Sequence, residues 1–134
     1  MKRKVIKACS MLLIVMIMSM PLLAHAAKKK GEAPFTFEEV KHQLYLGTYK
    51  STKNYVKAKI TMRSWGGDNY FTIHVYEKGW FGSTLVTRLG FEKSSKGSPY
   101  YDTDYSVKKG NTYIYELWKN RNGKIIKGSG TLYY

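Results

Sequence analysis

Hydrophobic and polar residues alternate along most of the chain after residue 44. Val56, Ala58 and Ile60 alternate with lysines, and Phe71, Ile73 and Val75 alternate with polar or ring-bearing residues. A period of two is typical of strands with one buried face. Because turn residues recur about every ten residues, the pattern predicts seven strands, at 45–50, 55–65, 70–77, 83–92, 101–107, 112–119 and 124–133, with Phe81, Leu85, Leu89 and Phe91 facing inward.

The run Gly66-Gly67-Asp68-Asn69 predicts a hairpin that joins strands 55–65 and 70–77. In that register Trp65 lies opposite Tyr70 and Arg63 opposite Thr72. All the polar and aromatic positions of the two strands then share one solvent-facing side, because side chains two apart project from the same face.

A second hairpin is predicted at Asn122-Gly123, a dipeptide that favours tight turns between strands. The expected pairs are Leu117 with Gly128 and Tyr115 with Gly130. Each glycine would leave room for the larger side chain to lie across its strand.

Residues 37–44 are predicted to form one short helix. Thr36 is placed as its N-cap, Glu39 would complete a capping box, and Phe35 would pack against Val40. The alternative for the same segment is an edge strand.

Together these elements predict an all-β fold, an antiparallel sandwich with a short N-terminal helix. The run Lys109-Gly110-Asn111-Thr112-Tyr113-Ile114-Tyr115 resembles the start of a strand in fibronectin type III and other immunoglobulin-like domains. There a tyrosine can hydrogen-bond back across a corner. The resemblance implies a fold class and carries no function.

The first 26 residues have the features of a cleaved signal peptide. Lys2, Arg3, Lys4 and Lys7 precede an apolar stretch at 11–24, and small residues follow at Ala24 and Ala26. We expect cleavage before Ala27, a basic flexible linker at 27–34 and one domain at 35–134. An uncleaved anchor is the alternative, although the apolar stretch is shorter than the roughly 20 residues that span a bilayer.

Export predicts a secreted protein, extracellular or associated with the cell envelope. The one cysteine, Cys9, would be removed with the signal. The exported chain would then have no disulfide, no thiolate metal site and no cysteine nucleophile.

The exported chain is strongly basic. Removing the four signal-peptide cations leaves 19 Lys and Arg against 9 Asp and Glu, a net charge of +10. This exceeds what solubility requires of a small domain and favours an anionic partner.

The sequence offers no constellation typical of an enzyme. His42 and His74 have no further ligand or carboxylate at suitable spacing, and Asp102 with Asp104 reads as a charged strand edge, with a cation site or a glycosidase pair as alternatives. We therefore predict no catalytic residues, no metal and no cofactor.

The predicted binding residues lie on the outer side of the first hairpin, where cations alternate with rings: Tyr55, Lys57, Lys59, Arg63, Trp65, Tyr70, His74 and Tyr76. Cations bind phosphate or carboxylate, while rings stack on sugars or enter membrane interfaces. An ordinary solvated strand face is the alternative explanation of this pattern.

The leading hypothesis is a non-enzymatic binding protein, monomeric, that attaches to anionic envelope polymers or glycans. One alternative is an antimicrobial, bacteriocin or toxin-like protein that acts on anionic membranes by inserting Trp65, Trp80 and Trp118. Another is an inhibitor or partner of a second secreted protein. Nucleic acid would be attracted to so basic a surface, but export makes it an unexpected physiological partner.

Overall fold

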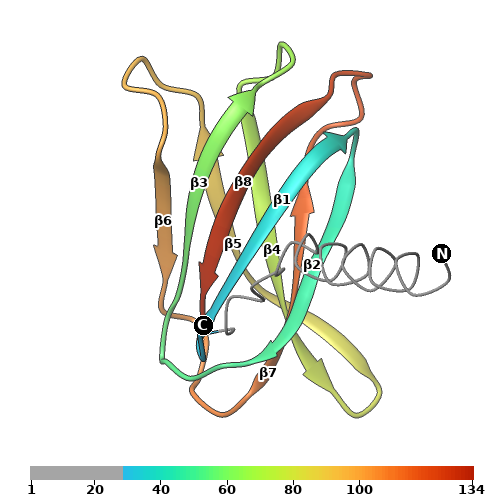
Figure 1. The fold of residues 1–134 in the computed structure, drawn as a ribbon. Coiled ribbons are helices and arrows are strands. Elements are labelled where there is room, and N and C mark those ends of the chain that lie inside the picture. The colour runs from blue at the N-terminus through green and yellow to red at the C-terminus, as the bar shows by residue number, and fades with distance from the viewer. Residues whose placement is uncertain (1–28) are drawn as a thin grey trace, which may run out of the picture.

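The computed structural model describes residues 29–134, so the predicted signal peptide and its cleavage site lie outside the described residues. The chain forms eight strands, one more than the seven predicted, and they lie in two layers (Figure 1). They are β1 (Glu32–Val40), β2 (Gln43–Lys50), β3 (Val56–Ser64), β4 (Tyr70–Gly79), β5 (Gly82–Glu92), β6 (Tyr100–Asp104), β7 (Thr112–Trp118) and β8 (Ile126–Tyr133).

The predicted antiparallel β-sandwich is confirmed. Sheet A has the strand order β1-β8-β3-β6 and sheet B the order β2-β7-β4-β5. The first strand pairs with the last, and successive strands alternate between the sheets until the β4–β5 hairpin. This is the double Greek-key order of a jelly roll, so the resemblance to immunoglobulin-like domains does not extend to the connectivity.

The corner that carried that resemblance does hold a tyrosine hydrogen bond. The backbone N–H of Lys108 donates to the hydroxyl of Tyr113 at 2.8 Å. Tyr113 is buried between the sheets, so its hydroxyl fixes the loop before β7 to the interior.

The predicted helix at 37–44 is wrong, since the segment belongs to β1 and β2. Phe35 and Phe37 of β1 face the interior while Thr36 and Glu38 face outward, a period of two that outweighs the capping pattern of Thr36 and Glu39. β1 begins at Glu32, inside the predicted linker, because residues 32–37 pair with β8. Residues 29–134 contain no helix, hence none long enough to cross a membrane.

Both predicted hairpins are wrong in their pairing. β3 pairs with β6 and β8, whereas β4 pairs with β5 and β7. The turn at 66–69 therefore carries the chain from one sheet to the other. Gly66 sits in this turn with φ of 57°, and a side chain there would collide with the carbonyl of Ile125.

The expected packing of rings over glycines does occur, with different rings. β7 and β8 lie in different sheets, so Gly128 and Gly130 pair instead with Phe37 and Phe35 of β1. A Cβ atom on Gly128 would come within 2.6 Å of the Phe37 ring. The two glycines thus let the β1 phenylalanines lie across β8.

The inner faces of the two sheets form one core. Its fully buried side chains come from both layers and include Phe37, Val56, Ile60, Phe71, Ile73, Leu89, Phe91, Tyr113, Tyr115, Leu117, Ile126 and Leu132. The alternation of β3 and β4 predicted this orientation correctly. Phe81, expected inward, is fully exposed at 105%, because the β4–β5 hairpin extends past the opposite sheet. Leu85, also expected inward, pairs with the outward-facing Tyr76 after a register shift, and Val86 packs against the core instead.

Lys119 closes one end of the sandwich from inside. Lys119 is only 5% exposed, and its ammonium group lies 2.8 Å from the Asp68 carboxylate. It also donates to oxygens of two further loops: the carbonyls of Lys41, Asn120 and Lys124 and the side chain of Asn122. One charge therefore ties together the connections after β1, β3 and β7.

Asp68 stays ionised in this setting. Burial acts to raise its pKa, but hydrogen bonds from Lys119 and Asn122 and the nearby ammonium groups of Lys119 and Lys124 outweigh burial, so the pKa lies below its ordinary value. A lowered carboxyl pKa stabilises the fold above the unfolded value of about 4 and loses this effect as the pH falls through the folded value.

Lys119→Met is expected to lower the free energy of unfolding by about 3–5 kcal/mol, because it leaves the opposite charge of a buried pair uncompensated. Urea denaturation at neutral pH measures this. Lys127→Met, at an exposed position of β8, serves as the control and should change stability by about 0.5 kcal/mol or less. A loss for Lys119→Met no larger than that of the control would contradict the closing role of Lys119.

Candidate binding faces

The predicted binding residues are divided between opposite sides of the molecule. Tyr55, Lys57, Lys59 and Arg63 belong to the segment that enters and forms β3 in sheet A, whereas Tyr70, His74 and Tyr76 belong to β4 in sheet B. The expectation of one continuous face is therefore wrong. The cause is the turn at 66–69, which passes between the sheets and reverses the direction in which outer side chains point.

Trp65 lies on neither outer face. It is 9% exposed and packs against Phe71 and Tyr100, with ring centroids 5.7 and 5.5 Å apart. The register of β3 shifts between Met62 and Ser64, so the alternation that predicted an outward Trp65 ends before the strand does.

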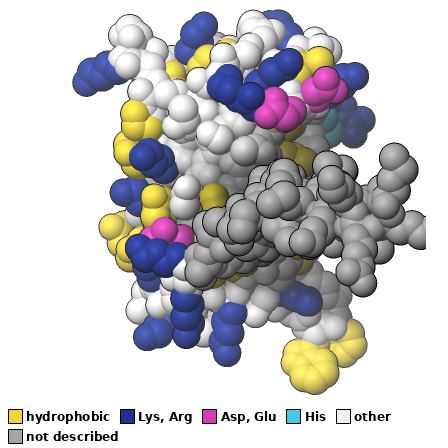
Figure 2. All heavy atoms as spheres, in the orientation of Figure 1, with side chains coloured by type: hydrophobic (Ala, Val, Ile, Leu, Met, Phe, Trp, Pro, Cys, Tyr) yellow, Lys and Arg dark blue, Asp and Glu magenta, His cyan; other side chains and the backbone are white. Residues whose placement is uncertain are grey.

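On the outer side of sheet A, three strands supply a mixed row of cations and rings. Lys57 lies between Tyr133 of β8 and Thr103 of β6, and Lys59 between Thr131 and Tyr101. We call this surface the lysine–tyrosine face: Lys53, Tyr55, Lys57, Lys59, Tyr101, Lys127, Thr131 and Tyr133. Figure 2 shows basic side chains with hydrophobic ones between them along β3 and β6.

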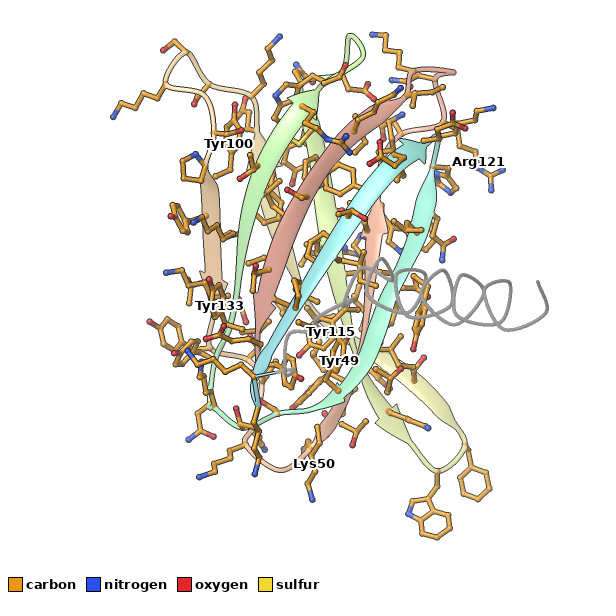
Figure 3. All side chains as sticks on the ribbon, viewed as in Figure 1. Tyr49, Lys50, Tyr100, Tyr115, Arg121 and Tyr133 are labelled. Atoms are coloured by element: carbon orange, nitrogen blue, oxygen red, sulfur yellow. The ribbon has the colours of Figure 1, made fainter. Side chains whose placement is uncertain are left out.

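The ammonium groups of Lys53 and Lys57 lie over rings of this face. Lys57 is 4.9 Å from the centroid of Tyr101 and 5.9 Å from that of Tyr133. Lys53 is 5.4 Å from Tyr55 and 5.6 Å from Tyr133. Tyr133, which Figure 3 places at the end of β8, thus attracts two cations through its ring.

Acidic residues neutralise only the margin of the face. Glu38 of β1 pairs with Arg63, and Glu32 pairs with Lys29 at 3.0 Å. Within residues 29–134, none of the ion pairs involves Lys53, Lys57, Lys59 or Lys127. Lys57 and Lys59 lie on the inner strand β3, and Lys53 and Lys127 lie toward its two ends, so the outer side of sheet A keeps a net positive charge.

Sequence reasoning missed five of the eight residues of this face, because they come from other segments: Lys53, Tyr101, Lys127, Thr131 and Tyr133. A signal was present in β8, where Lys127, Ser129, Thr131 and Tyr133 alternate with small or apolar residues. This alternation predicted that the four side chains face outward together, but not that β3 would lie beside β8.

The outer side of sheet B carries a separate aromatic cluster. The rings of His74 and Trp118 stack at 5.0 Å with 12° between their planes, and His42 meets Trp118 edge-on at 5.1 Å. Tyr70 and Arg121 join them in lining a cleft of about 260 Å³. We call this the aromatic cleft.

Hydrogen bonds hold the cluster in place. The carboxylate of Glu116 accepts from the Trp118 indole at 2.9 Å and from the Gln43 amide at 3.0 Å. His74 shares a hydrogen bond of 3.1 Å with Tyr76. Trp118 is therefore fixed within the cluster, and of the three tryptophans proposed to enter membranes only Trp80 is fully exposed, at 98%.

His74 lies in a row with Glu116 on one side and Arg88 on the other. Burial lowers its pKa, the positive charge of Arg88 lowers it further, and Glu116 opposes both. A lowered histidine pKa means that the neutral ring is favoured in the folded state, and the associated stability is lost as the pH falls through that value.

The carboxylate of Asp102 makes a structural hydrogen bond and does not form an exposed pair with Asp104. It faces inward from β6 and accepts the backbone N–H of Gly90 at 2.8 Å, linking the edges of the two sheets. Within the described part of the chain, no three His, Cys, Asp or Glu side chains are grouped as metal ligands would be.

Comparison with protein-family models, with curated proteins and with solved structures gives no match for this chain. Its function is therefore inferred from its geometry and charge.

The imidazole of His74 should titrate below the ordinary histidine pKa of about 6.5, which NMR observation of its ring protons can measure. Arg88→Gln should raise the His74 pKa and Glu116→Gln should lower it, because each removes one of the two flanking charges. An unchanged pKa in both variants would show that these charges do not act on the ring.

Proposed function

We propose that this chain is a secreted, non-enzymatic binding protein that attaches to anionic polymers of the cell envelope through the lysine–tyrosine face. The observation that carries the proposal is the position of the Tyr133 ring, whose centroid lies 5.6 Å from the ammonium group of Lys53 and 5.9 Å from that of Lys57. Positive charge and flat apolar surface thus meet at the same point of the sheet.

An acidic polysaccharide has the matching chemistry. Its carboxylate or phosphate groups would pair with the lysines, and the C–H faces of its sugars would lie on the rings of Tyr101 and Tyr133. Lys57 and Lys59 are two residues apart on one strand, about 7 Å, so they can contact successive groups along an extended chain.

The binding free energy that the lysines supply favours a polymer over a small anion as the ligand. Near an anionic surface each lysine contributes about 1 kcal/mol, so four lysines supply about 4 kcal/mol, a dissociation constant of about 1 mM. Repeated anionic groups raise the effective concentration and convert such weak contacts into stable attachment.

The double variant Lys57→Glu plus Lys59→Glu should abolish retention of the chain from Ala27 on immobilised polygalacturonate. It replaces two attractive contacts by two repulsive ones in the middle of the face. Retention of the unsubstituted chain should fall as salt rises above about 0.15 M, because screening weakens exposed charge pairs.

Lys93→Glu plus Lys96→Glu provides the matched control. It makes the same change in net charge at exposed positions of the β5–β6 loop, away from the lysine–tyrosine face. If the two double variants lose retention equally, attraction depends on net charge alone and the face is not the site. If neither loses it, the proposal is wrong.

A further inference from the structure

The β4–β5 hairpin reaches beyond the rest of the sandwich (Figure 1). The last residue of β4 that pairs with β7 is Glu77, and the hairpin continues through Lys78 and Gly79 to its tip, about 10 Å further at the usual rise per residue. Trp80 and Phe81 form this tip and are 98% and 105% exposed. Figure 2 shows hydrophobic side chains standing clear of the body there.

Two adjacent large aromatic side chains, Trp80 and Phe81, are fully exposed at this tip. A protruding turn can be built from polar residues, and here it carries the two most exposed large hydrophobic side chains of residues 29–134. Burying them elsewhere would be favourable, since each ring removes a large apolar area from water. We call this pair the Trp–Phe tip.

A basic hollow opens at the same end of the sandwich. It has a volume of about 370 Å³ and is lined by Lys30, Lys50, Ser51, Thr52, Lys109 and Gly110. Three lysines line it and no acidic residue does. The hydroxyls of Ser51 and Thr52 already donate to the carbonyls of Lys53 and Tyr134, so the lysines are the groups left to bind an anion. We call it the lysine hollow; Figure 3 shows Lys50 pointing away from the body at this end.

The walls of the lysine hollow are held by backbone hydrogen bonds. Ser51 donates to the carbonyl of Asn111 and Gly110 donates to that of Ser51, both at 2.8 Å. The loop before β3 is thus fixed to the loop before β7, so the backbone that carries Lys50 and Lys109 is in place before any anion binds.

The lysine hollow and the Trp–Phe tip lie at the same end because of the strand directions. β2 finishes at Lys50, β7 starts at Thr112 beside it, and β4 passes β7 on its way to the tip. Further lysines belong to this end: Lys78 at the base of the tip, and Lys53 and Lys108 in the adjoining loops.

We propose that this end of the sandwich docks on an anionic lipid bilayer, with the Trp–Phe tip entering the interface and a lipid phosphate held in the lysine hollow. Tryptophan favours the boundary between headgroups and hydrocarbon, and lysines are attracted to anionic headgroups. A protein pocket could take the rings alone, but a bilayer accounts for both the rings and the lysines at the same end. The Trp–Phe tip and the lysine hollow share no residue with the lysine–tyrosine face, and Lys53 of that face lies in the adjoining loop.

The test uses the chain from Ala27, which holds both sheets and the whole core, with vesicles of phosphatidylcholine containing phosphatidylglycerol. Vesicles should shift the tryptophan emission to shorter wavelength, because Trp80 leaves water. Trp80→Ser plus Phe81→Ser should remove this shift and weaken co-sedimentation about tenfold or more.

Charge is tested separately. Lys50→Gln plus Lys109→Gln should weaken co-sedimentation about thirtyfold, whereas Lys93→Gln plus Lys96→Gln, at the opposite end, should weaken it less. Lys57→Glu plus Lys59→Glu should leave the emission shift in place, so the failure of this proposal and that of the polymer proposal can be told apart.

Three results would overturn the proposal. The first is no binding to these vesicles, and the second is equal binding to vesicles of phosphatidylcholine alone. The third is binding of inorganic phosphate or polygalacturonate that depends on Lys50 and Lys109 while vesicles are ignored, which would make the lysine hollow an anion site unrelated to a membrane.

Discussion

The structure depends on one constraint: each sheet has an apolar face that is buried only against the other sheet. Ile60 of β3 and Ile73 of β4 must therefore point toward each other from opposite layers. The outer side chains of the same two strands, such as Lys59 and Thr72, must then point in opposite directions. This geometry fixes the separation of the lysine–tyrosine face from the aromatic cleft, and no change of local sequence could bring them onto one side without breaking the core.

Burial of a charge supports this arrangement where the chain crosses between sheets. Crossing turns leave backbone carbonyls without strand partners, and unpaired buried carbonyls are costly. The ammonium of Lys119 binds carbonyls from the loops after β1 and β7 and the carboxylate from the loop after β3. It thereby ties these loops together from inside.

The sequence predicted which side chains face inward far better than which strands lie together. Alternation places Val56, Phe71 and Leu117 in the core because the period of a strand is a local property. Pairing is not local: Gly66-Gly67 and Asn122-Gly123 can close a hairpin or cross between layers, and the difference depends on what the opposite sheet must bury. The capping pattern at Thr36 failed for the same reason, since β8 offers glycines that the phenylalanines of β1 can cover only as a strand.

The positive charge of the chain takes different forms at its two basic surfaces. On sheet A, the lysines project from the same side of the sheet. Lys53 and Lys57 place their ammonium groups 4.9–5.9 Å from ring centroids, an arrangement suited to an extended ligand. At the end near Lys50, lysines line a hollow and two rings are fully exposed, an arrangement suited to a surface with an apolar interior. The net positive charge alone would attract the chain to any polyanion. The placement of the rings differs between the two surfaces and therefore decides which kind of ligand each can bind. The aromatic cleft stands apart, because its rings satisfy one another and Glu116 balances Arg88 across His74.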